Sequence, residues 1–311
     1  LSLTVSNSIK PLGDTDPAKL LIKAASNKPN GTLIYHNSES YPVYATVEMY
    51  SKASYDLTKT DESDRYQWQY FGVPVQAMSA SPTFDGAFVR AYNEAGTTTS
   101  NHWVNLTNSS VLTPFYGYEL CQKDPKTYTF SGKLVNSNFS PGTLTMSSDG
   151  LYKGQYVFAN PYTAPVDIRL LTFGSDTQAG VYIYNCGSFG SWYSETSQSD
   201  TAAVSPGQYM ASTIYTAGIN EVPRYISSMQ GFVVSRLTTS STVTFGMNYS
   251  AASTGYILQK AKSVDADQLS STQITISSTA GKDKVWIITN PSGSAKYDWG
   301  WDANKKTGSA L

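Results

Sequence analysis

The sequence is poor in charged residues. Asp, Glu, Lys and Arg together make up 14% of the 311 residues, and the formal net charge is -1. Proteins that bind nucleic acids usually carry a basic face that neutralises phosphates. No cluster of Lys and Arg occurs in this chain. We therefore predict that nucleic acid is not a partner.

Long apolar segments are absent as well. A helix needs about 20 apolar residues to cross a bilayer, whereas the longest apolar runs, such as residues 231–234, are far shorter. The sequence therefore predicts no transmembrane segment in this chain. The chain opens on the alternating pattern LSLTVS, with neither an initiator Met nor a signal peptide, so we expect it to be a piece of a longer protein.

Residues that often carry catalysis are scarce. The chain has 2 histidines, His36 and His102, and no G-x-S-x-G sequence around a nucleophilic serine. A carboxylate pair for glycoside hydrolysis would draw on Glu119, Asp167 and Glu195. Such a pair belongs in one place, whereas these acids lie in or near blocks of sequence that recur. We therefore predict no catalytic residues and no enzyme activity.

Cysteine is equally rare, with Cys121 and Cys186 as the 2 cysteines. A disulfide would need their Cα atoms within about 7 Å, and the alternative is two separate buried thiols. Together with two scattered histidines they do not form a zinc site. We predict no cofactor other than calcium, which is considered below.

Alternation of apolar and polar residues is the dominant pattern. In YPVYATVEMY, residues 41–50, every second residue from Val43 to Met49 is apolar, which is the period of a half-buried strand. The same period recurs in GVYIYN, TVTFGMNY and QITIS, and clusters of Gly, Pro, Asn and Ser separate these runs. Only residues 16–25 and 260–269 show a helical period. The sequence therefore predicts an all-β protein.

Three blocks of sequence recur in the same order. YQWQYFGVPVQA resembles YKGQYVFANPYTAP, and GAFVRAYNEAG with HWVNL resembles AGVYIYNCGSFGSWYS. The second match aligns Trp103 with Trp192. In the third, YGYELCQKDPKTYTFSG resembles MQGFVVSRLTTSSTVTFGM and aligns Gly117 with Gly231. Collinear blocks of this kind indicate an internal repeat with loops of unequal length.

Each set of blocks reads as a strand that ends at a proline, followed by two hairpins, which is typical of a β-sandwich. We predict two related β-sandwich domains in tandem, over residues 1–132 and 133–247. A partial third β unit follows over residues 248–311. Most of the extra length of the second domain falls in the polar stretch of residues 194–220.

The stretch YVFANPYTAPVDI, residues 156–168, runs from a strand-like start into an Asn-Pro turn. Its counterpart YFGVPVQA keeps the strand and aligns Pro74 with Pro161, but has Val73 in place of Asn160. Proline lacks the N–H that would continue a ladder. We interpret the stretch as a structural joint, so any special role of Asn160 belongs to the second domain alone.

The same blocks carry a resemblance to a known group of proteins. The first set, GTLIYHN, ATVEMY, WQYFGVPV, AYNE, GYEL and TFSGKL, resembles a pattern of large secreted and cell-surface proteins of the Bacteroidetes. The second set is similar to the companion pattern GNPY, PIDI, YVYN, W and QGF-x-V. The final YDWGWDANK resembles the F-D-x-G-x-D-A-x-K element that follows in those proteins.

The resemblance implies an adhesin-like, exported protein at the cell surface or in the extracellular space. The expected function is a non-enzymatic adhesion or scaffold module. Its expected partner is an extracellular protein or a glycan.

A glycan-binding β-sandwich module is the alternative function. Sugars bind to flat aromatic faces with polar groups nearby, and the candidate aromatic residues are Trp103, Trp192, Tyr193, Trp299 and Trp301. Core packing is the other interpretation of Trp103 and Trp192, because a duplicated fold keeps its packing more readily than its ligands. Exposure of these side chains distinguishes the two.

Calcium is the one metal for which the sequence offers ligands. In DWGWD, Asp298 and Asp302 flank Gly300, and a turn at the glycine would direct both carboxylates inward. The other interpretation is that these are solvated loop acids. No loop of the chain has the ligand spacing of an EF-hand.

Overall fold

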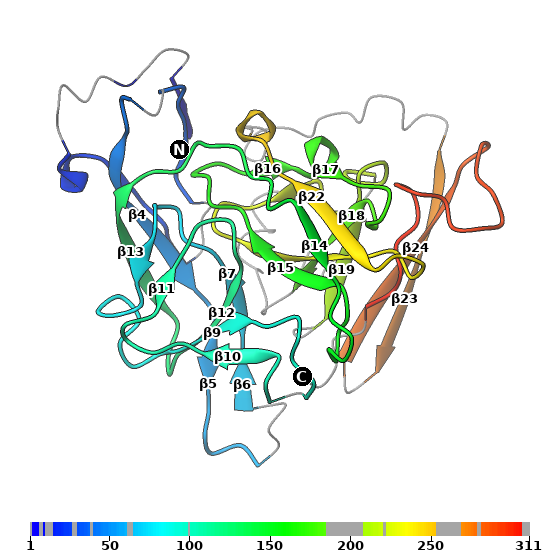
Figure 1. Ribbon diagram of the computed structural model, residues 1–311, viewed down its shortest axis with the longest axis horizontal. Helices are drawn as coiled ribbons and strands as arrows, with labels where there is room; N and C mark the ends of the chain where they lie inside the picture. Colours follow the sequence, from blue (N-terminus) through cyan, green and yellow to red (C-terminus); the bar gives the residue numbers. More distant parts are fainter. Residues whose placement is uncertain are drawn as a thin grey trace.

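The computed structural model describes residues 2–5, 9, 15–26, 30–37, 40–60, 65–98, 100–184, 208–219, 222–252, 269–278 and 281–306. Strands form almost all of the regular structure in these residues, which confirms the all-β prediction. Figure 1 shows β4 and β13 at one side of the molecule, β15, β18 and β22 further along, and the β23–β24 hairpin at the opposite side.

The first group of strands, called the first unit, covers residues 44–133. Its four-stranded sheet contains, in spatial order, β10 (Trp103–Asn105), β9 (Phe88–Tyr92), β12 (Tyr118–Cys121) and β7 (Gln69–Phe71). Three strand pairs accompany it: β4 (Tyr44–Ser51) with β13 (Lys126–Lys133), β8 (Met78–Ser79) with β11 (Val111–Leu112), and β5 (Ser54–Tyr55) with β6 (Tyr66–Gln67).

The second unit covers residues 143–246. Its four-stranded sheet contains, in spatial order, β19 (Tyr209–Thr213), β18 (Gly180–Tyr184), β21 (Gly231–Ser235) and β15 (Gln155–Ala159). Two further groups are β14 (Thr143–Thr145) with β22 (Thr242–Gly246) and β17 (Thr172–Phe173), and β16 (Val166–Asp167) with β20 (Tyr225–Ile226).

The two units have the same strand order. If the strands of each four-stranded sheet are numbered in chain order, both sheets have the spatial order third, second, fourth, first. All neighbouring strands in the two sheets are antiparallel. The long pair β4–β13 has its counterpart in β14–β22, and the short pair β8–β11 in β16–β20. The strands of the two sheets therefore correspond one to one: β7 to β15, β9 to β18, β10 to β19 and β12 to β21.

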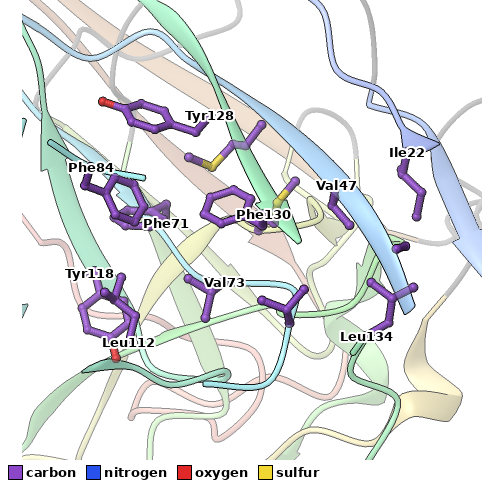
Figure 2. Close-up of a cluster of buried hydrophobic side chains, with 14 of the residues drawn as sticks. Ile22, Val47, Phe71, Val73, Phe84, Leu112, Tyr118, Tyr128, Phe130 and Leu134 are labelled. Atoms are coloured by element: carbon purple, nitrogen blue, oxygen red, sulfur yellow. The ribbon is translucent and has the colours of Figure 1, made fainter. Parts of the chain in front are cut away.

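Strand alternation builds the core of the first unit. Every second residue of β4 is buried, including Val47 and Met49. These side chains face the four-stranded sheet across an aromatic layer, in which Phe84 lies 5.2 Å from Phe71 and 6.0 Å from Phe130 between ring centroids. Figure 2 shows these three rings close together. Burial of each such side chain contributes about 1.5–3 kcal/mol.

The second unit has a separate core. The Phe158 ring stacks on Phe245 at 4.9 Å between centroids, and Phe232 lies 5.8 Å from Phe245. Tyr162 is fully buried in this core, and its hydroxyl donates to the backbone oxygen of Ser137 at 2.9 Å. Both cores are thus closed by aromatic rings contributed from strands far apart in sequence.

The two four-stranded sheets meet end to end at a joint with local two-fold symmetry. One antiparallel bridge pairs Phe71 with Gln230, and the other pairs Phe158 with Tyr116. Phe71 ends β7, and Phe158 lies in β15, the counterpart of β7. The bridge made by Phe71 of the first unit therefore has its equivalent in the bridge made by Phe158 of the second unit.

Hydrogen bonds across the joint repeat the same symmetry. The backbone N–H of Gly72 donates to the oxygen of Met229 at 3.0 Å, and that of Ala159 donates to the oxygen of Phe115 at 2.8 Å. Phe115 (φ 72°) and Met229 (φ 61°) are the two non-glycine residues with positive φ in the described part of the chain. A left-handed non-glycine residue is strained, so surrounding contacts must hold both corners in place.

The Asn-Pro turn of residues 156–168 lies at this joint, and its interpretation as a structural feature is confirmed. Asn160 is fully buried. Its side-chain amide donates to the backbone oxygens of Ala164 (2.9 Å), Ile226 (3.1 Å) and Ser227 (3.1 Å). Its Oδ1 accepts from the N–H of Tyr162 at 2.9 Å. All polar atoms of the side chain are used inside the protein, which leaves none for a ligand.

Further strands of the described residues are β1 (Ser2–Thr4) parallel to β3 (Thr32–Ile34), β2 (Leu21–Ile22) parallel to β4, and the hairpin of β23 (Ser270–Ser278) with β24 (Gly281–Thr289). The described residues also contain the 3-10 turns η1 (Pro17–Lys19), η2 (Ile168–Leu170), which lies within the second unit, and η4 (Tyr249–Ala251).

The helical period predicted for residues 16–25 is wrong beyond one turn. Asp16 caps η1 by accepting from the N–H of Ala18 at 2.9 Å. The chain then becomes extended, because Leu21 and Ile22 pair with β4. Pairing with a neighbouring strand outweighs the local helical pattern. The other predicted helix, residues 260–269, lies almost entirely outside the described residues.

Candidate functional site

Four of the residues predicted as site residues lie together in one turn after β24, namely Asp298, Trp299, Trp301 and Asp302. Trp103 lies in β10 of the first unit. Trp192 and Tyr193 lie outside the described residues.

The two aspartates of this turn are engaged in holding the turn itself. The carboxylate of Asp298 accepts from the backbone N–H of Ser294 at 2.6 Å and from its hydroxyl at 2.7 Å. The carboxylate of Asp302 accepts from the N–H of Asp298 at 2.8 Å. Gly300 has φ +83°, the left-handed conformation that glycine adopts readily. The hydrogen bonds from Ser294 hold the pKa of Asp298 below its usual value.

No group of three or more His, Cys, Asp or Glu side chains with metal-site geometry occurs among the residues that the structure describes. Calcium usually takes six to eight oxygen ligands. Asp298 and Asp302 would need several further oxygens, so calcium at this turn stays a prediction.

The tryptophans of the turn fix it against the second unit. The indole Nε1 of Trp299 donates to the backbone oxygen of Thr177 at 3.0 Å, and the ring packs against the core of the second unit. Trp301 packs against Tyr215 at 5.4 Å between centroids. The N–H of Tyr215 donates to the oxygen of Gly300 at 3.0 Å. Both tryptophans are half-buried, so their contacts with the protein leave part of each ring exposed.

A groove of about 410 Å³ lies between this turn, the hairpin and β19. Lys284 and Trp286 line it from β24, and Trp301 lines it from the turn. Its volume suits a small ligand. The charges of Asp298 and Asp302 are already satisfied by hydrogen bonds of the turn, and Lys305 pairs with Asp283 at 2.6 Å. These two carboxylates and Lys305 are therefore already engaged with neighbouring groups of the protein.

Trp103 is a packed residue, with 4% of its surface exposed. Its ring lies 5.2 Å from Tyr70 and 5.2 Å from Tyr92 between centroids. It also lines the wall of a pocket. The burial of Trp103 fits the core-packing interpretation, and a role of this residue in ligand binding stays a prediction.

Strand register corrects the alignment of Trp103 with Trp192. In the first unit Trp103 is paired with Tyr92, and in the second unit Tyr209 is paired with Tyr184. Because Tyr92 and Tyr184 hold the same position in the two sheets, the counterpart of Trp103 is Tyr209. The sequence match failed because the polar stretch before β19 has no counterpart in the first unit.

Tyrosines from both units meet beside Trp103, and the sequence analysis did not single them out. Tyr70 of the first unit stacks on Tyr184 of the second at 4.6 Å between centroids and 11° between planes. The hydroxyls of Tyr70 and Tyr209 share a hydrogen bond of 2.8 Å. Burial raises the pKa of both hydroxyls far above the usual value, so both stay protonated. The abundance of tyrosine, 23 residues, was the available signal.

Two carboxylates considered for hydrolysis are paired with arginines. Glu119 on β12 forms an ion pair with Arg90 on the neighbouring β9, and the Arg90 guanidinium lies 3.7 Å from the centre of the Trp68 ring. Burial raises the pKa of Glu119 to about 8, against the opposing attraction of Arg90. Asp167 pairs with Arg169 at 2.8 Å and with Arg224 at 3.0 Å.

These two carboxylates lie in different units and serve their own ion pairs. The third, Glu195, lies outside the described residues. Cys121 is a buried free thiol whose Sγ–H donates to the oxygen of Ser54 at 3.2 Å, and burial raises its pKa to about 12. A thiol with a raised pKa is a poor nucleophile. Cys186 also lies outside the described residues.

Within the described residues, no helix has the length and apolar character needed to span a membrane.

Comparison with known proteins identifies a distant relative. No protein-family model and no solved structure matches the chain. The chain is 27% identical over 338 residues to the minor fimbrium subunit Mfa5 of Porphyromonas gingivalis. The alignment covers 99% of this chain but 26% of that protein, so the chain spans about a quarter of its relative's length. Nearly the whole chain is thus similar to part of a bacterial fimbrium subunit, which supports the predicted location at the cell surface or in the extracellular space.

Proposed function

We propose that this chain is a non-enzymatic adhesion or structural module of a cell-surface appendage. The observation that carries the proposal is the similarity to a fimbrium subunit along 99% of the chain. Because the chain matches about a quarter of that relative, the proposal concerns a module and not the activity of a whole subunit.

The architecture supports a mechanical role. The joint between the units is built from backbone hydrogen bonds and packed glycines, and Tyr70 of the first unit stacks on Tyr184 of the second. Contacts of this kind resist hinge motion more than a flexible linker does. A stiff pair of β units is suited to a protein that bears load between a cell and a surface.

We further propose that the two units arose by duplication. The shared strand order and the symmetric joint support this interpretation, as does the collinear order of the recurring blocks. The boundaries at residues 132 and 247 and the partial third unit over residues 248–311 stay predictions. Limited proteolysis followed by mass spectrometry would locate them.

The proposal is tested by fractionation of cells that express the protein. Surface appendages are sheared from wild-type cells and from cells in which the coding region for these residues is deleted, and both fractions are probed with an antibody against the 311-residue chain. We expect the protein in the appendage fraction of the wild type and weaker attachment of the deletion strain to host or bacterial partner surfaces. A protein found only with the cytoplasmic fraction would overturn the proposal.

Glycan binding is a second candidate, favoured by one observation. A pocket lined by aromatic side chains lies where the two units meet, beside Tyr70 and Trp103. A glycan array probed with the purified chain tests this candidate, and an array with no signal above background would count against it.

A further inference from the structure

A pocket of about 260 Å³ opens at the junction of the two four-stranded sheets. Tyr70, Tyr92, His102 and Trp103 line it from the first unit, and Tyr152, Gln155 and Tyr209 line it from the second. Lys305 and Lys306, at the end of the described chain, complete its wall. The pocket therefore exists only when both units and the C-terminal segment are in place.

The walls of the pocket are aromatic and rigid. Tyr92 packs on Trp103 at 5.2 Å between centroids, and His102 packs on Tyr152 at 5.0 Å. Each ring is held by another ring, so the walls are formed before any ligand arrives. Flat apolar walls with a few polar groups are the usual lining of small-molecule sites, and the Gln155 amide provides one such group.

Lys306 has different surroundings from three half-buried or partly exposed arginines of the chain. Arg90, Arg169 and Arg224 each pair with a carboxylate. The ammonium of Lys306 instead donates a hydrogen bond of 3.3 Å to the hydroxyl oxygen of Ser235 and lies 4.6 Å from the centre of the Tyr182 ring.

No carboxylate of the described residues pairs with the Lys306 ammonium. Burial alone lowers its pKa to about 8, with no acidic neighbour to oppose the shift. A half-buried charge without an opposite charge nearby is costly, so the Lys306 ammonium is suited to an anion from outside as its counter-ion.

We propose that this pocket binds an anionic saccharide, with the sugar carboxylate paired to Lys306 and the ring held between the aromatic walls. The volume lies just below the range of about 300–1,000 Å³ for drug-sized ligands, which fits one sugar residue. The single unpaired ammonium matches one carboxylate. A phosphate carries more charge and is usually held by several cations or a bidentate arginine. The inference deepens the glycan-binding candidate and does not depend on the location of the protein in a fimbrium.

The test is a titration of the full 311-residue chain by calorimetry or by saturation-transfer NMR. The probes are N-acetylneuraminate and glucuronate, with N-acetylglucosamine and glucose as uncharged controls. We expect binding of at least one acidic sugar and weaker or no binding of the neutral sugars. The variant Lys306→Met should lower the affinity for the acidic sugar by about tenfold or more, because a charge-assisted hydrogen bond is lost.

A matched control uses Lys296→Met, which removes an exposed ammonium outside the pocket. We expect this variant to bind as the wild type does, and circular dichroism checks that both variants are folded. Equal affinity for acidic sugars in wild type and Lys306→Met would overturn the site, as would the absence of any binding by acidic sugars. If neutral glycans bind while acidic ones do not, the glycan-binding candidate stands and this site falls.

Discussion

Gly72 and Ala159 face each other across the joint between the two units: a Cβ atom placed on Gly72 would lie 2.3 Å from the Cβ of Ala159. The two residues hold the same place in the recurring blocks, each two positions before the aligned proline. Their backbone N–H groups make the two symmetric hydrogen bonds of the joint. The close approach is possible because one of the two residues lacks a side chain.

Gly72→Ala should therefore destabilise the protein strongly. The new methyl group would clash with the Cβ of Ala159, which is fixed to the backbone of the second unit. The clash can be relieved only if one unit shifts against the other. We expect a loss of about 3 kcal/mol or more in the free energy of unfolding, measured by urea denaturation.

The matched control for Gly72→Ala is Gly246→Ala in β22. A Cβ at Gly246 would have its nearest neighbour at 3.5 Å, an ordinary contact. We expect a change within about 1 kcal/mol there. Similar losses for the two variants would mean that the joint is not packed as described.

Asn160→Ala should also cost stability, because the amide is the hub of the turn. Its removal leaves three backbone oxygens and the N–H of Tyr162 without this partner in a fully buried place. We expect a loss of about 3–5 kcal/mol by urea denaturation, since each unsatisfied buried polar group costs about 1–3 kcal/mol. Asn108→Ala, at an exposed position, is the control and should change stability by less than about 0.5 kcal/mol. A mild effect at Asn160 would show that water replaces the amide.

Part of the fold could be predicted from local sequence patterns. The alternation of residues 41–50 and the prolines that end strands follow from local chemistry, so the β class and the nature of the Asn-Pro stretch were predictable. The match of Trp103 with Trp192 failed, because a loop insertion shifts the sequence while strand register fixes Tyr209 as the counterpart. Only pairing between strands decides such equivalences.

The candidate site was less predictable than the fold. The turn from Asp298 to Asp302 was found from its acids and tryptophans, but the hydrogen bonds that occupy Asp298 are a property of the folded turn. The pocket between the units depends on Tyr70 and Tyr209, which are 139 positions apart in the chain and meet through a hydroxyl contact of 2.8 Å. No local pattern encodes that contact.

Lys306→Met should raise the stability of the unliganded protein at neutral pH. The pKa of Lys306 is about 8 in the folded protein and 10.5 for an ordinary lysine. Between these two pH values the Lys306 ammonium is therefore protonated in more of the unfolded chains than of the folded ones. The contribution of Lys306 to the free energy of unfolding is lowest below about pH 8 and rises up to about pH 10.5.

Thermal melting checks this prediction. The variant should melt several degrees above the wild type at neutral pH. This difference in melting temperature should shrink as the pH approaches the pKa of an ordinary lysine, 10.5. A variant that melts lower than the wild type at neutral pH would show that the contacts with Ser235 and Tyr182 outweigh the cost of burying the ammonium.

Removal of divalent cations should leave the melting temperature unchanged. The Asp298 carboxylate is already hydrogen-bonded to Ser294, and the described residues contain no group of three or more His, Cys, Asp or Glu side chains that could hold a metal ion. Melting curves with EDTA and with added calcium test this. A rise of several degrees with calcium that Asp298→Ala abolishes would instead establish a structural ion at this turn.

The most direct test of the proposed function is protease treatment of intact cells that express the protein. Lys59 lies in an exposed turn of the first unit, where trypsin can reach it. If the chain is a surface module, mass spectrometry should identify peptides that end at Lys59 among those released from unbroken cells. Peptides from this chain that appear only after lysis, together with cytoplasmic proteins, would contradict the proposed function.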